Sequence, residues 1–137
     1  MSEAVIEDAA QLPAPTLAYI GDAVYELYVR EEMLKRHRTK ASRLHYLSVH
    51  YVRAQFQAEA AVRILPQLSE KEENILLRGR NANQGATAKH AAPQEYRWAS
   101  GLETLIGYLY LAGKKERLQE LLPAILHEET EDEPGQT

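Results

Sequence analysis

The segment formed by residues 17–29, LAYIGDAVYELYV, constrains the fold of this chain more than any other. Eight of the eleven residues from 19 to 29 are apolar or aromatic, and the exceptions are Gly21, Asp22 and Glu26. A helix that is apolar around nearly its whole circumference is normally buried. We therefore expect this segment to form a helix in the core.

Two carboxylates lie inside that apolar segment. Asp22 and Glu26 are four residues apart, so they share one face of a helix. A buried carboxylate without a partner is costly. No Lys or Arg occurs within residues 17–29, so either a distant basic residue pairs with Asp22 or a cation does.

Apolar residues at steps of three and four predict five helices, over about residues 13–36, 41–65, 70–78, 93–112 and 114–126. Pro13 opens the first of them, and Ser69 with Glu72 forms a capping box before the third. Gly113 is placed to end the fourth. No segment shows strand-like alternation and no internal repeat is present, so the predicted fold is all-α.

Composition excludes several classes of function. The 137 residues fit one domain, and the absence of cysteine excludes disulfides and thiolate chemistry. No apolar run reaches the length of about 18 residues that a membrane span needs, and the acidic N-terminus is unlike a secretory signal. We therefore expect a soluble, cytoplasmic protein.

Charge is distributed unevenly along the chain. The net charge is −4, but residues 9–127 hold 16 basic and 12 acidic side chains, a net of +4, and the two ends are acidic. A mildly basic body is compatible with a polyanionic partner and equally with an ordinary mixed surface.

The catalytic motifs that can be recognised locally are absent. The histidines show no H-E-x-x-H spacing, and no G-x-S-x-G elbow or Walker loop occurs. Asp22 and Glu103 are left, each inside a strongly apolar helix. Carboxylates suit Mg²⁺ or Mn²⁺, although either residue could instead cap a backbone group or pair with an arginine.

Two motifs resemble those of ribonuclease III domains. LAYIGDAVYEL is similar to the family's first motif, Arg-Leu-Glu-Phe-Leu-Gly-Asp-Ala, and SGLETLIGYLYL to its last, Asp-x-x-Glu-Ala-Leu-Ile-Gly-x-x-Tyr-Leu. The piece between them, ASRLHYLSVHYVRAQFQAEA, resembles the family's Ser-Arg helix at Ser42 and Arg43. The short length and the RGRNA segment make the mini-ribonuclease III subfamily the nearest resemblance.

The resemblance implies a single helical bundle, the ribonuclease III endonuclease domain, over residues 13–127. Residues 1–12 would be an entry segment, and residues 128–137 a disordered acidic tail in place of a double-stranded-RNA-binding domain. The family's metal-site acids fall on Asp22 and Glu103. Two further family acids are replaced by Ala18 and Ser100, so we expect fewer protein ligands and more bound water, with Glu26 either in an outer shell or simply on the helix surface.

The implied activity is Mg²⁺-dependent cleavage of double-stranded RNA to 5′-phosphate and 3′-hydroxyl ends, with Mn²⁺ as a substitute. The family works as a homodimer, and the subfamily is linked to maturation of precursor 23S ribosomal RNA. RNA phosphates would then be contacted by basic and polar residues of the loop region: Arg78, Arg80, Asn81, Lys89 and Arg97. A non-catalytic helical RNA-binding or dimerisation module and, less favoured, an all-α nucleotide hydrolase are the alternatives.

Overall fold

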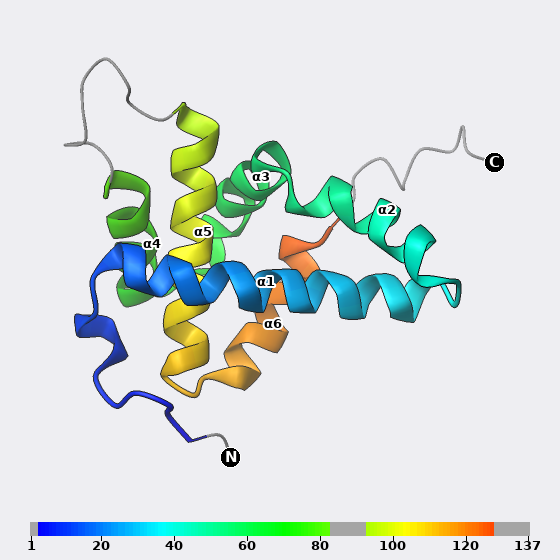
Figure 1. The fold of residues 1–137 in the computed structure, drawn as a ribbon. Coiled ribbons are helices and arrows are strands. Elements are labelled where there is room, and N and C mark those ends of the chain that lie inside the picture. Colours follow the sequence, from blue (N-terminus) through cyan, green and yellow to red (C-terminus); the bar gives the residue numbers. More distant parts are fainter. Residues whose placement is uncertain (1–2, 83–92, 128–137) are drawn as a thin grey trace.

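The computed structural model describes residues 3–82 and 93–127, and all regular structure in those ranges is helical (Figure 1). The prediction of an all-α, single-domain fold is confirmed. The elements are, in order, η1 (Ala9–Gln11), α1 (Ala14–Arg36), α2 (Ala41–Val52), α3 (Ala54–Ile64), η2 (Leu65–Gln67), α4 (Glu70–Asn81), α5 (Gln94–Leu111) and α6 (Lys115–Ile125).

Local sequence sets several helix ends. Pro13 is the N-cap of α1, where a missing N–H costs nothing because the first helical N–H groups have no partner within the helix. The capping box of α4 is formed: Glu72 N–H donates to Ser69 Oγ at 3.1 Å, and Ser69 N–H donates to Glu72 Oε1 at 2.9 Å. After α5, Gly113 has φ of 78°, a conformation that strains residues with a Cβ.

Helix α5 is the centre of the molecule. It packs against α1, α3, α4 and α6, and Figure 1 shows α1 crossing it while α3 and α4 lie on its two sides. Leu102, Leu105, Ile106 and Leu109 are fully buried. This burial explains why the fourth predicted helix has the most continuous apolar sequence, since a central helix must be apolar on most of its surface.

The sequence predicts one long second helix, but the structure breaks it at Arg53. This residue has extended backbone angles (φ −70°, ψ 149°) between α2 and α3. Two side chains bind the carbonyls that the break leaves free: the Tyr25 hydroxyl donates to the carbonyl of Tyr51, and Gln57 Nε2 donates to that of Val52 at 3.0 Å. Because Tyr25 comes from another helix, local spacing could not reveal the break.

Candidate active site

Helices α1 and α5 touch backbone to backbone. A Cβ built on Gly21 would lie 1.8 Å from the carbonyl oxygen of Glu103, and one on Gly107 would lie 1.9 Å from that of Leu17. Only glycine fits at either position, because a methyl group would overlap a main-chain oxygen of the other helix. The crossing point of the two helices is thereby fixed by their main chains.

This crossing brings Asp22 and Glu103 together. Asp22 follows Gly21, and Glu103 lies one turn before Gly107, so both side chains emerge beside the contact. Burial, then the charge of Asp22 and a hydrogen bond with it, raise the pKa of Glu103 to about 7. Two carboxylates from helices far apart in the sequence therefore form one acidic pair.

The expectation that residues 17–29 form a core helix holds for only one side of α1, because the other side is exposed. Asp22 is exposed, and on the same outer surface of α1 Tyr19 is 78% exposed, Leu27 54% and Leu34 49%. The inner surface of α1 packs on α5, α4 and α2. The apolar residues of α1 thus serve two surfaces, and in this chain only one of them is covered.

The acidic pair has no basic partner in residues 3–82 and 93–127. The ion pairs of α1 in those ranges involve other acids, Glu26 with Arg30 at 2.8 Å and Glu32 with Arg36 at 2.9 Å. Glu26 is exposed and its carboxylate is engaged by Arg30, which supports its assignment as a helix-surface residue. In the described part of the chain, no distant arginine neutralises Asp22.

Sequence reasoning missed two residues next to Glu103. Gln57 is 5% exposed, and its side chain lowers the pKa of Glu103 through a hydrogen bond, partly offsetting the effect of burial. Tyr25 is buried, and its pKa is raised by that burial and then by the charge of Glu103. A polar Gln57 between Ala54 and Ala58, on the small-residue face of α3, is the sequence signal that could have indicated it.

The positions of the two missing family acids lie close together. Ala18 and Ser100, each about one helical turn from a carboxylate of the pair, line one small cavity together with Gly79 and Thr104. The described residues contain no group of three or more His, Cys, Asp or Glu side chains placed to hold a metal ion. Two carboxylates, one of them exposed to solvent, fit a hard divalent cation that keeps several waters, as Mg²⁺ does.

The predicted RNA contacts have different surroundings. Arg80 and Arg97 lie near one another at the end of α4 and the start of α5. The Arg80 guanidinium stacks 4.8 Å from the centroid of the Trp98 ring and donates to Asn81. Arg97 is half-buried, and its buried Nε has no hydrogen-bond partner in the described residues. Asn81 is exposed.

Arg78 is placed differently from the other candidates. Its guanidinium donates to the carbonyls of Ala10 and Leu12 at 2.9 and 2.7 Å, so it anchors the N-terminal segment on α4. Lys89 lies outside the described residues, as do residues 83–92 and the predicted acidic tail.

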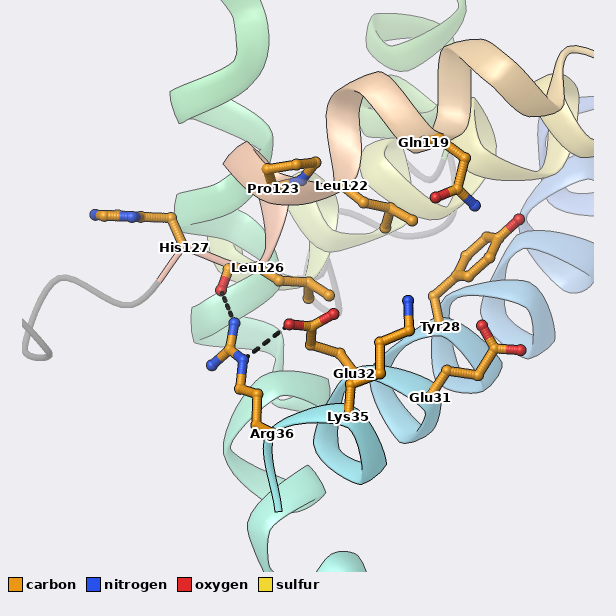
Figure 2. Close-up of a pocket in the computed structure, with 10 residues that line it drawn as sticks. All are labelled: Tyr28, Glu31, Glu32, Lys35, Arg36, Gln119, Leu122, Pro123, Leu126 and His127. Carbon is orange, nitrogen blue, oxygen red and sulfur yellow. Dashed lines mark hydrogen bonds and ion pairs between the residues drawn. The ribbon is translucent and has the colours of Figure 1, made fainter. Parts of the chain in front are cut away.

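A separate polar pocket lies between the second half of α1 and α6 (Figure 2). Arg36 spans it, donating to Glu32 at 2.9 Å and to the carbonyl of Leu126 at 3.4 Å. Neither Asp22 nor Glu103 lines this pocket. The pocket therefore lies where the ends of α1 and α6 meet, and it is not part of the acidic site.

Known proteins resemble this chain in sequence and in fold. Residues 15–114 match the family model described as "Ribonuclease III domain". The chain is similar to proteins named Mini-ribonuclease 3 from Symbiobacterium thermophilum (47% identical, 82% of this chain and 87% of the relative) and Enterococcus faecalis (44%, 85% and 90%). A crystal structure from Fusobacterium nucleatum has a TM-score of 0.73 at 26% identity, over 88% of this chain and 97% of the other. The chain belongs to the ribonuclease III family of endoribonucleases.

Proposed function

We propose that this protein hydrolyses phosphodiester bonds of double-stranded RNA in a Mg²⁺-dependent reaction, leaving 5′-phosphate and 3′-hydroxyl ends. The observation that carries the proposal is the meeting of Asp22 and Glu103 at a glycine-only helix contact, without a basic partner in the described residues. A divalent cation is the natural counter-charge for such a pair. Mn²⁺ offers the same preference for oxygen ligands and would substitute.

The two acids would have different roles in that reaction. Asp22 is exposed and would meet the cation and the RNA from the solvent side, whereas the partly buried Glu103 would hold the cation from the protein side. A bound Mg²⁺ supplies a water of lowered pKa and stabilises charge on a phosphoryl oxygen. The glycine contact keeps the carboxylates in place, so little reorganisation is needed before attack.

The substrate proposal rests on the shape of duplex RNA. A-form RNA is bound through phosphates and 2′-hydroxyls across its minor groove, and Arg80, Asn81, Lys89 and Arg97 are proposed for those contacts. Arg78 could join them only by exchanging its hydrogen bonds to the N-terminal segment. Cleavage should weaken at high salt, because Lys and Arg contacts to phosphate release counterions. Precursor 23S ribosomal RNA is the proposed natural substrate.

A homodimer is proposed on the outer surface of α1. Tyr19, Leu27 and Leu34 are large apolar side chains at helical spacing, and each is about half exposed or more. Large apolar side chains left exposed along one helix are typical of an interaction site. A second copy packed on these three side chains, with Asp22 left open to solvent, would place two acidic pairs along one duplex and double the contact area with RNA. No helix in the described part of the chain is long and apolar enough to cross a membrane. A cytoplasmic location is proposed.

The test is cleavage of a defined RNA duplex by the purified protein with Mg²⁺ or with EDTA. Asp22→Asn and Glu103→Gln should abolish Mg²⁺-dependent cleavage and leave the circular dichroism spectrum unchanged. Glu26→Gln, on the same face of α1 but paired with Arg30, is the matched control and should cleave like the wild type. Wild-type protein that binds the duplex but cleaves it under neither condition would instead support the RNA-binding module, for which the replacement of two family acids by Ala18 and Ser100 is the motive.

A further inference from the structure

Positive charge gathers where α1 passes into α2. Residues 33–58 contain six Lys or Arg side chains, three His and no Asp or Glu. All six Lys and Arg residues are exposed. Only one of them, Arg36, forms an ion pair within the described residues, and its partner is Glu32. The other five cations therefore face solvent with no carboxylate of the described chain to balance them.

Helix stability explains only part of this charge. Lys35 and Arg36 lie in the last turn of α1, where a cation complements the partial negative charge of a helix C-terminus. Lys40, by contrast, is the N-cap of α2, and Arg43 lies in the first turn of that helix, which contains no acidic residue. Cations at these positions oppose the partial positive charge of a helix N-terminus. Contacts within the described chain therefore do not account for Lys40 and Arg43.

An exposed aromatic ring lies among these charges. Tyr46 is 68% exposed, and Cζ of Arg43 lies 5.4 Å from the centroid of its ring. The Arg43 side chain makes no hydrogen bond to a described residue, so its N–H donors are left for an outside partner. Arg38, Lys40, Arg43 and Tyr46, here named the α1–α2 corner, thus combine unpaired cations with an aromatic face, as surfaces that bind RNA strands do.

Helix α1 connects the α1–α2 corner to the acidic pair. Asp22 and Arg36 both lie on α1, and 14 residues at about 1.5 Å each place them about 21 Å apart along the helix axis. Figure 1 shows α4, which carries Arg80, near the opposite end of α1 from α2. The acidic pair therefore lies between two basic regions, and a polyanion that crosses it along α1 can reach both.

We propose that the α1–α2 corner is a second RNA-binding site, which holds the sugar–phosphate backbone of the substrate away from the cleaved bond. This inference rests on the proposed function. The site adds affinity through phosphate contacts and does not touch the reacting groups, because it lies at and beyond the end of the helix that carries Asp22. The backbone belongs either to the continuing duplex or to a single-stranded flank, which offer the same phosphates. Tyr46 adds a stacking surface that only unpaired bases can use.

The test is RNA binding at several salt concentrations by the Asp22→Asn protein, the parent, which should not cleave its ligand. The corner variant adds Arg38→Gln, Lys40→Gln and Arg43→Gln to this parent. At about 0.1 M salt it should bind RNA about 10-fold or more weakly than the parent. The slope of log affinity against log salt should become shallower by about 2–3, because each lost phosphate contact removes about 0.7–0.9.

A control variant removes the same charge from another surface. It carries Lys71→Gln, Lys114→Gln and Lys115→Gln in the same parent, and these three lysines are exposed on α4 and at the start of α6. Its RNA affinity should stay within about twofold of the parent, with an unchanged salt slope. An equal loss of affinity in both variants overturns the inference, because binding would then follow net charge and not the position of the cations.

Three RNAs identify the backbone that the site holds: a short blunt duplex around the cleaved bond, the same duplex lengthened, and the short duplex with a single-stranded flank. The corner variant should bind the short duplex like the parent and lose the affinity that an extension adds. A loss confined to the lengthened duplex assigns the site to duplex, and a loss confined to the flanked RNA assigns it to single strand. Tyr46→Leu should weaken binding only in the second case.

Equal affinity and equal salt slope for the corner variant and the parent overturn the inference. A lower unfolding temperature with unchanged RNA affinity does the same, because it assigns the three cations to the fold. Should the triple variant fail to fold, Arg43→Gln alone should reduce the slope by about 1, and an unchanged slope counts against the site. With Asp22 intact, the corner variant should raise KM and keep kcat within about twofold. A wild type that cleaves no duplex refutes the proposed function only, since the binding measurements still decide the role of the corner.

Discussion

Replacement of Glu103 by glutamine should make the metal-free protein more stable at alkaline pH. In the unfolded chain this carboxyl loses its proton near pH 4.5, whereas in the folded protein burial and Asp22 move its pKa to about 7. Between these values the folded state binds more protons than the unfolded state, so its stability falls as pH rises. The favourable contribution of the protonated Glu103 carboxyl to the stability of the folded protein is complete below pH 4.5 and is lost above pH 7.

The size of the effect follows from that shift. At about 1.4 kcal/mol for each pH unit the shift corresponds to about 3 kcal/mol, and screening through the solvent-exposed side of the pair reduces it to about 1–2 kcal/mol. Glutamine is neutral at every pH and should match the wild type near pH 4.5. At pH 8.5 the variant should unfold roughly 3–8 °C higher than the wild type.

The assay is thermal unfolding, followed by circular dichroism, from pH 4.5 to 8.5 in EDTA. Glu95→Gln removes an exposed glutamate of the same helix and should follow the wild-type curve. Adding Mg²⁺ at pH 8.5 should stabilise the wild type and leave Glu103→Gln unchanged. Parallel pH curves for wild type and Glu103→Gln would refute the reasoning, because burial and the charge of Asp22 would then not disfavour the ionised form of Glu103 in the folded protein.

Three further outcomes are expected from the packing. Gly107→Ala would place a methyl 1.9 Å from the carbonyl oxygen of Leu17 and should cost about 3 kcal/mol in urea unfolding; a change below about 0.5 kcal/mol would contradict the backbone contact. Arg117→Met removes the 2.9 Å ion pair with Glu72, whose pKa is lowered first by the hydrogen bond from Arg117. The variant should lose about 1–2 kcal/mol of unfolding free energy at pH 7. This loss should shrink as pH falls through the Glu72 pKa, because the pair stabilises the fold only while that carboxyl is ionised. A pH-independent difference in unfolding free energy between variant and wild type would refute this. Leu27→Glu should convert a dimer to a monomer in sedimentation velocity, and an unchanged sedimentation coefficient would place the interface elsewhere.

Local chemistry explains which parts of the fold were predictable from sequence. The capping box of Ser69 and Glu72 and the left-handed Gly113 involve residues close together in the chain, so their patterns indicate helix ends directly. The break at Arg53 depends on Tyr25 from another helix and on the side chain of Gln57. No residue near Arg53 carries that information by itself, and spacing alone therefore predicted a continuous helix.

The site was predictable to a similar extent. Carboxylates in apolar helices indicate Asp22 and Glu103 as candidates, and the motifs that resemble ribonuclease III predict that these two residues pair. The exposure of Asp22 could not be predicted, because an apolar helix surface looks the same in sequence whether it is covered by the same chain or left open. Gln57 was missed because glutamine has no strong pattern of its own and gains its significance only from the neighbour that folding gives it.

The glycine contact has a consequence for how this site could change over time. Since the main chains of α1 and α5 already touch at Gly21 and Gly107, the helices cannot move closer, and moving them apart would leave a void along the core. The separation of the two carboxylates can therefore be adjusted only by exchanging aspartate for glutamate, one methylene at a time. The carboxylate separation at such a site can change in steps of one methylene, or the site can be lost, but the separation cannot change gradually.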